Sequence, residues 1–126
     1  MRSRILLHTL TAMCVAVPMA ADAATAIKST SGLIAGDGSR RLGHGFTSQR
    51  LGAGDYLLTF SAGAFPTTGP AFTCSPAGIE HNAEICDVWL TDWHTQSPTT
   101  VEIHLYSNQD GTMEDNSFFF TELTTR

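Results

Sequence analysis

The sequence predicts an all-β protein, namely an antiparallel, jelly-roll-like β-sandwich of about seven short strands. Apolar and polar residues alternate with a period of two in several windows, each bounded by Gly, Pro, Asn or Asp. No window has a convincing apolar period of 3.6 residues, which argues against amphipathic helices. The chain has 126 residues, of which 42% are hydrophobic, and this is enough for one domain with one core.

Residues 1–23 are typical of a secretory signal peptide. Arg2 and Arg4 precede a mostly apolar stretch, and Ala21-Asp22-Ala23 supplies small residues where a signal peptidase reads the chain. That stretch is too short and too interrupted for a membrane anchor. We therefore expect a single β-sandwich domain over residues 24–126 that is exported, either to the medium or to a periplasm. A lipoprotein acylated at Cys14 is the alternative, but the residues before Cys14 resemble a lipoprotein box poorly.

The first four predicted strands are separated by short glycine-rich turns. Residues 31–35 end at Gly36-Asp37-Gly38, and residues 46–51 are followed by Gly52-Ala53-Gly54. The third strand, residues 55–60, places Tyr56, Leu58 and Phe60 on one face, which we assign to the core. A loop rich in Gly and Pro, residues 63–70, leads to the fourth strand, residues 71–75.

The remaining predicted strands are residues 85–93, 99–107 and 117–123. The strand at 99–107 has the clearest pattern, because Val101, Ile103 and Leu105 alternate with polar residues, as in a half-buried antiparallel strand. Asp110-Gly111 marks the next turn. The strands at 85–93 and 117–123 are apolar on both faces, so each needs a cover on its second face. Either the loop at 63–70 with Phe65 or a second subunit could supply it.

Two cysteines, Cys74 and Cys86, remain after removal of the signal segment. An even pair in an exported domain is expected to form a disulfide. The spacing offers no CxxC motif, so a metal site built on these cysteines is not expected.

The net charge of the chain limits the classes of molecule that the protein can bind. The formal net charge is −5, with only seven Lys and Arg residues in the chain. A protein that binds nucleic acid needs a basic surface, so we exclude that class of partner. No apolar run after the signal segment is long enough to span a bilayer, so no membrane contact is expected after cleavage.

A set of motifs resembles a known superfamily. Gly43-His44-Gly45-Phe46-Thr47, followed by Gly54-Asp55-Tyr56 and then Phe60, resembles a stretch of complement globular-head domains, in the tumour-necrosis-factor-like jelly-roll superfamily. It is also similar to bacterial exported and phage tail-fibre head modules, and the segment 115–120 resembles their closing strand. The resemblance implies a trimeric, non-enzymatic binding or structural domain, and it carries over no catalytic residue.

Four residues of the strand at 85–93 are candidate binding residues: Asp87, Trp89, Thr91 and Trp93. The two tryptophans are four apart and share a face on a regular strand, together with the two polar residues. Core packing is the more usual role of such aromatics. Rings mixed with polar groups suit a binding surface, for a glycan or for a cell-surface protein.

Two other groups of side chains offer atoms that can bind a metal ion. His94 and His104, with Asp92 or Glu102, could form a zinc or copper site, although solvent-exposed histidines are the commoner case. The acidic turn over residues 110–115 has oxygen ligands that suit Ca²⁺, although a solvated hairpin tip is more usual. We expect neither a metal ion nor another cofactor.

An enzyme is not expected. The chain has no Gly-x-Ser-x-Gly elbow, and a domain of this size leaves little room for a glycosidase cleft. The alternative function is a small secreted hydrolase that uses His94 or His104 with Asp92.

Overall fold

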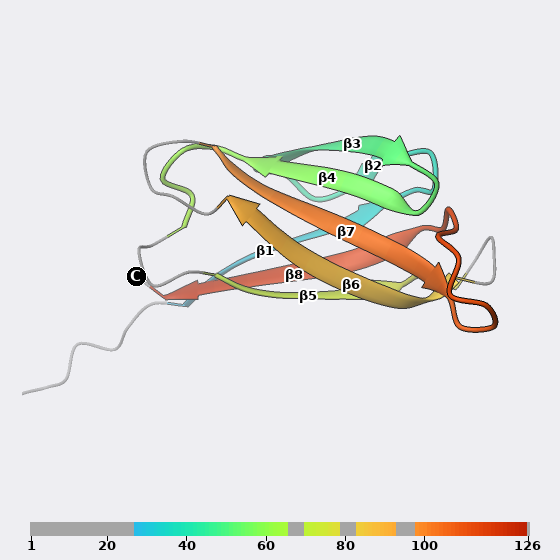
Figure 1. Cartoon of the computed structure of the whole chain (residues 1–126). Helices are drawn as coiled ribbons and strands as arrows, with labels where there is room; N and C mark the ends of the chain where they lie inside the picture. Colours follow the sequence, from blue (N-terminus) through green and yellow to red (C-terminus); the bar gives the residue numbers. More distant parts are fainter. Residues whose placement is uncertain (1–26, 66–69, 79–82, 93–97, 126) are drawn as a thin grey trace, which may run out of the picture.

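The computed structural model describes residues 27–65, 70–78, 83–92 and 98–125, and these form two antiparallel sheets of four strands each. The strands lie in two facing layers (Figure 1), and the residues that the structure describes contain no helix. Their bounds, in chain order, are β1 Ile27–Ile34, β2 Arg40–Leu42, β3 Phe46–Gly52, β4 Asp55–Phe60, β5 Ala71–Pro76, β6 Ala83–Asp92, β7 Thr99–Ser107 and β8 Phe118–Thr125. The predicted fold class, an all-β antiparallel sandwich, is confirmed.

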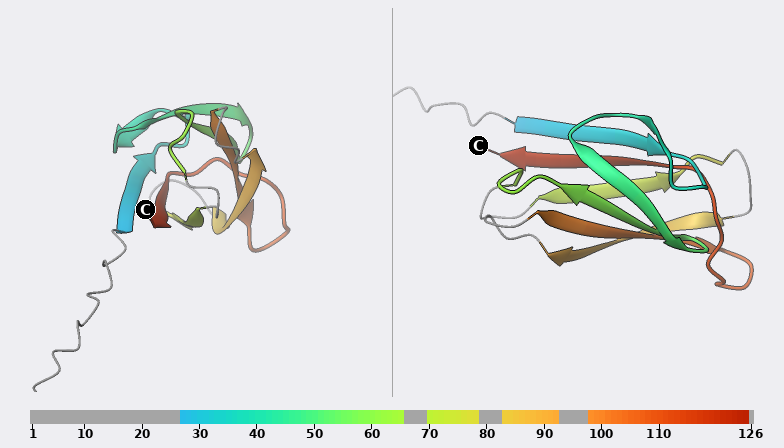
Figure 2. Two further views of the ribbon diagram at one scale, coloured as in Figure 1. Left: turned by 90° about the vertical axis from the view of Figure 1, so that its left-hand side faces the viewer. Right: turned by 90° about the horizontal axis from the view of Figure 1, so that it is seen from above.

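The strand order combines pairs of consecutive strands with pairs of strands that are distant along the chain. One sheet has the order β2-β1-β8-β5 and the other β3-β4-β7-β6, and the two are seen end-on and from above in Figure 2. The first and last strands, β1 and β8, pair with each other, and β4 pairs with β7. Immunoglobulin-type sandwiches place their first and last strands in different sheets, so this order differs from theirs.

The core lies between the two sheets and is rich in aromatic rings. Tyr56, Leu58 and Phe60 of β4 are all buried in it, as the alternation of that strand predicts. Phe120 of β8 packs edge-on against Phe46, with ring centroids 4.8 Å apart, and this contact joins the two sheets. The buried cluster consists of Ile34, Phe46, Tyr56, Leu58, Phe60, Phe65, Val101, Ile103, Leu105, Phe118 and Phe120.

The structure differs from the sequence prediction at one short strand and one loop residue. The eighth strand, β2, was not predicted, because its three residues Arg40–Leu42 are all exposed and show no alternation. One of the two alternatives for covering the outer face of a strand uses Phe65 and its loop. Phe65 is instead buried in the core, 5.0 Å from Phe60 and 5.8 Å from Phe72 between ring centroids. The interpretation of Phe65 as an outer cover is therefore wrong.

One carboxylate ties three parts of the chain together at an end of the sandwich. Asp115 accepts two hydrogen bonds from the Arg50 guanidinium, at 2.8 and 2.7 Å, and one from the Gly54 amide at 3.0 Å. The buried Tyr56 hydroxyl lies 3.0 Å from Asp115 Oδ1 and 2.9 Å from the Gly36 carbonyl oxygen. The β3–β4 hairpin is thereby joined to the segment before β8.

The turn between β3 and β4 depends on glycine at position 54. Gly54 has a φ of 67°, in the left-handed region that favours glycine. A Cβ there would lie 2.5 Å from the Leu105 carbonyl oxygen and 2.7 Å from the Glu114 amide nitrogen. The backbone therefore comes close enough for the Gly54 amide to reach Asp115 only because no side chain intervenes.

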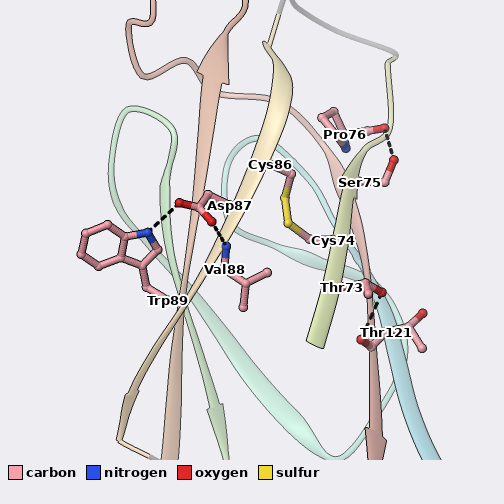
Figure 3. Close-up of a disulfide and its surroundings, with 9 residues drawn as sticks. All are labelled: Thr73, Cys74, Ser75, Pro76, Cys86, Asp87, Val88, Trp89 and Thr121. Atoms are coloured by element: carbon pink, nitrogen blue, oxygen red, sulfur yellow. Dashed lines mark hydrogen bonds between the residues drawn. A yellow bond between two sulfur atoms is a disulfide. The ribbon is translucent and has the colours of Figure 1, made fainter. Parts of the chain in front are cut away.

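The predicted disulfide is present and links the two sheets. Cys74 of β5 is bonded to Cys86 of β6, and these strands lie in different sheets (Figure 3). The two cysteines are separated by 12 positions along the chain. A covalent bond therefore holds one side of the sandwich closed, next to the core.

The buried carboxyl of Glu122 leads to a stability prediction. Glu122 of β8 is buried, on the same face of the strand as Phe120. Its Oε1 has no hydrogen-bond partner among the described residues. Burial raises the pKa of Glu122, and hydrogen bonds with Thr124 and Thr30 oppose this only in part. A raised folded-state pKa means that Glu122 favours folding at acidic pH, and that this contribution is lost as the pH rises above the ordinary glutamate value.

We therefore expect Glu122→Gln to raise the free energy of unfolding at pH 7 by about 1 kcal/mol, because the amide carries no charge to bury. At pH 4, where the native carboxyl is already protonated, the difference should shrink toward zero. Urea unfolding of both proteins at the two pH values measures this. An equal difference at both values would contradict the assignment of a buried, protonated Glu122.

Candidate functional site

The candidate site lies on the outer face of the β3-β4-β7-β6 sheet, away from the core. Val101, Ile103 and Leu105 of β7 point inward and are fully buried, so Glu102 and His104 between them point outward. The strand pairing places Trp89 of β6 beside Glu102, and it places His104 between Asp87 of β6 and Asp55 of β4. We call the set Asp55, Asp87, Trp89, Thr91, Glu102 and His104 the outer-face cluster.

Trp89 is the most exposed aromatic side chain of this cluster, with 54% of its surface accessible. Its indole Nε1–H donates a hydrogen bond of 2.8 Å to Asp87 Oδ2, and the other oxygen of Asp87 accepts from the Val88 amide. Figure 3 shows the indole and Asp87 on the side of β6 away from the disulfide. The ring of Trp89 also packs on His104, with centroids 5.2 Å apart. The indole is therefore held in one orientation while much of its surface stays open.

Thr91 lies on the same face as Trp89, at a local irregularity in β6. The pairing of β6 with β7 shifts between Leu90 and Asp92, which is a bulge. The Thr91 hydroxyl lies 3.1 Å from the Thr100 carbonyl oxygen and 2.9 Å from the Thr100 hydroxyl. Two hydroxyl groups therefore stand together on the face that carries Trp89.

His104 is buried beneath this surface. Lone histidines are more often exposed to solvent. Only 8% of the surface of His104 is accessible. Its Nε2 lies 3.5 Å from Asp55 Oδ1 and 3.6 Å from Glu102 Oε2. Ligand atoms of these three residues all lie within 4.8 Å of one another, which is close enough for a shared metal ion. The sequence raised Glu102 as a partner of His104 only as an alternative that it did not favour, and it gave no indication of Asp55.

The predicted binding residues are therefore brought together in part. Asp87, Trp89 and Thr91 lie on one outer face, and a core position for Trp89 is wrong. Trp93, His94 and the side chain of Asp92 lie outside the described residues, so the Trp93 prediction and the hydrolase that would use His94 with Asp92 stay predictions. Asp55 could have been found only from the pairing of β4 with β7, since 49 positions separate it from His104 along the chain.

The two aspartates of the acidic turn over residues 110–115 accept hydrogen bonds from other residues of the protein. Asp110 Oδ1 accepts hydrogen bonds from the amide and the hydroxyl of Thr112, at 3.0 and 2.7 Å. Asp115 is bonded to Arg50, whose hydrogen bonds lower the pKa of Asp115 to about 2. The interpretation of the whole turn as a solvated hairpin tip is therefore wrong for Asp115. Neither aspartate has both oxygens free for a Ca²⁺ ion.

Comparison of the chain with protein-family models, with curated proteins and with solved structures found no match. Within the segments that the structure describes, no helix is long and apolar enough to cross a membrane.

Proposed function

We propose that the protein is an exported, non-enzymatic binding module that recognises a neutral saccharide on the outer face of the β3-β4-β7-β6 sheet. The observation that carries this proposal is the half-exposed indole of Trp89, which Asp87 and His104 hold in place. A ring that is fixed before binding loses little conformational entropy when a ligand stacks on it.

The chemistry around Trp89 favours a sugar over an apolar ligand. The C–H face of a pyranose ring can pack on an indole, while its hydroxyl groups need acceptors close to the plane of the ring. The carboxylates of Glu102 and Asp55 and the hydroxyls of Thr91 and Thr100 supply such acceptors on the same face.

The sign of the charge narrows the class of ligand. Three carboxylates, of Asp55, Asp87 and Glu102, belong to the outer-face cluster, and the whole chain has a net charge of −5. Sulfated sugars and uronic acids would be repelled, because like charges disfavour association. Neutral glucose-, galactose- or N-acetylglucosamine-type units are therefore the proposed ligands.

Export is supported by the disulfide and by the N-terminal pattern. The bond between Cys74 and Cys86 suits an oxidising compartment outside the cytoplasm. The signal-like segment at 1–23 lies outside the described residues, so its cleavage and the choice between medium and periplasm stay predictions.

Self-association is also part of the proposal, as a trimer of the kind that the superfamily resemblance implies. On the opposite sheet, the outer face of β8 leaves Phe119 and Leu123 about half exposed, and these offer an apolar surface for a second copy. This surface is separate from the outer-face cluster, so binding and association can be tested apart.

We expect Trp89→Ala to weaken saccharide binding at least tenfold, because removal of a central aromatic anchor typically costs more than about 1.4 kcal/mol. An array of neutral oligosaccharides identifies a binder, and calorimetry with that soluble, monovalent sugar then gives the affinity. Phe119→Ala is the matched control, since it removes an equally exposed aromatic from the opposite sheet and should leave the affinity unchanged.

The proposal is wrong if no neutral saccharide binds the native protein, or if the folded Trp89→Ala variant binds as tightly as the native protein does. Circular dichroism and a thermal melt establish that each variant is folded.

A further inference from the structure

We propose that Asp55, Glu102 and His104 form a binding site for a divalent transition-metal ion of the Zn²⁺ class. This site goes beyond saccharide recognition, and it shares the carboxylates of Asp55 and Glu102 with the proposed saccharide surface. It lies on the outer face of the β3-β4-β7-β6 sheet, next to Trp89, and it departs from the expectation that the protein holds no metal.

The spacing of the three ligand atoms fits a metal ion better than it fits hydrogen bonds. A charge-assisted hydrogen bond between nitrogen and oxygen is typically about 2.7–2.9 Å long. Here His104 Nε2 lies 3.5 Å from Asp55 Oδ1 and 3.6 Å from Glu102 Oε2. A tetrahedral Zn²⁺ with bonds of about 2.0–2.1 Å separates its ligand atoms by about 3.3 Å. The two distances from His104 are therefore close to those of a zinc ligand set, and the carboxylate oxygens lie within 4.8 Å of each other.

One buried polar atom at the proposed site, Asp55 Oδ1, lacks a hydrogen-bond partner among the described residues, and this points independently to a ligand. His104 is more than nine-tenths buried, and its Nε2 is directed at the two carboxylates. A buried acceptor without a partner costs about 1–3 kcal/mol, and a bound cation would remove that cost.

The ligands are positioned by rigid elements. Asp55 and His104 are directly paired across β4 and β7, and Glu102 lies two residues before His104, so it shares the same face. Trp89 packs on the imidazole and limits its rotation. Three protein ligands leave at least one coordination position for water or for a ligand oxygen, as in open zinc sites.

The donor set selects the class of metal. One imidazole nitrogen with two carboxylate oxygens suits Zn²⁺ and its neighbours in the first transition row, whereas Ca²⁺ and Mg²⁺ prefer oxygen ligands alone. The two carboxylates also balance the charge of a divalent ion. A metal bound through Nε2 leaves the imidazole proton on Nδ1, which is buried and has no hydrogen-bond partner among the described residues.

Calorimetric titration of the purified, chelator-treated protein with ZnCl₂ tests this site, using protein without a histidine tag. We expect one ion per chain to bind the native protein, and Ca²⁺ and Mg²⁺ to bind far more weakly. Asp55→Asn and Glu102→Gln conserve size and should each lower the Zn²⁺ affinity at least tenfold, because even residues that only support metal ligands commonly contribute that much.

His44→Ala is the control, because it removes an exposed imidazole outside the cluster and should leave the affinity unchanged. Substitution with Co²⁺ gives a second readout, since a four-coordinate site of this kind produces visible d–d absorption that the Asp55→Asn variant should lose. The inference is overturned if no Zn²⁺ binds, or if folded Asp55→Asn and Glu102→Gln proteins bind it like the native protein. The latter result would place the ion on other histidines. Neither result bears on the saccharide proposal, which is measured without metal.

Discussion

Replacement of both Cys74 and Cys86 by alanine is expected to lower the free energy of unfolding by about 3 kcal/mol. The disulfide closes a loop between residues that are 12 positions apart, and the chain-entropy model gives about this value for a loop of that length. For a domain of roughly 100 residues, the melting temperature should fall by about 15 °C. Guanidinium unfolding under oxidising conditions measures the change.

The effect should be large because the bond joins two sheets that no backbone hydrogen bond connects at that place. β5 and β6 are edge strands of different sheets, and they lie next to each other where the disulfide joins them. Reduction of the native protein is the matched control, because it breaks the bond without changing the sequence, and it should give nearly the same loss. A double variant within about 1 kcal/mol of the native protein would contradict this account of how the sandwich is held closed.

Asp115→Asn is expected to lower the free energy of unfolding at pH 7 by about 2–3 kcal/mol. The substitution removes the charge that pairs with Arg50 and weakens the contact with the buried Tyr56 hydroxyl. Hydrogen bonds to charged groups typically contribute about 1.5–3 kcal/mol. Because both side chains of the ion pair remain partly exposed, we take a value within the range for one such bond and not the sum over several.

The pH dependence gives this prediction a second readout. The pKa of Asp115 is about 2 in the folded protein, chiefly because of its hydrogen bonds with Arg50, against an ordinary value of 3.8. A depressed folded-state pKa contributes stability above the unfolded-state value, and this contribution is lost as the pH falls from about 4 to 2. The difference between the native protein and Asp115→Asn should therefore shrink over that interval.

Asp110→Asn serves as the control for Asp115. Asp110 is exposed and bonds only within its own turn, so its substitution should leave the stability nearly unchanged. Equal effects of the two substitutions would show that Asp115 does not tie the β3–β4 hairpin to the segment before β8.

Local patterns in the sequence were sufficient to predict most strands and their buried faces. Val101, Ile103 and Leu105 alternate with polar residues, and each is fully buried in β7, because one face of an antiparallel strand must meet the core. The short strand β2 escaped prediction for the opposite reason. Arg40–Leu42 bury nothing, so hydrophobic alternation could not mark them. Phe65 was placed on the wrong side because a loop carries no periodicity.

The candidate site depended on contacts that only the folded chain defines. Trp89 and Asp87 were found from the sequence because their contact is local, over two residues of one strand. The cluster of Asp55 with His104 needs the register of β4 against β7, which no local pattern specifies. The partnership of Arg50 with Asp115 spans 65 positions and likewise follows from the fold. Long-range pairing was therefore the part that sequence patterns could not reach.

The central claim is that the outer face around Trp89 binds a neutral saccharide, and an NMR titration tests it most directly. A ¹⁵N-labelled sample is titrated with the sugar selected on the array, and the backbone amide and indole signals are followed. We predict that the largest shifts fall on the Trp89 indole Nε1–H and on the amides of Asp87, Trp89 and Glu102. Shifts confined to the β2-β1-β8-β5 sheet, or no shift at a saturating sugar concentration, would contradict the claim.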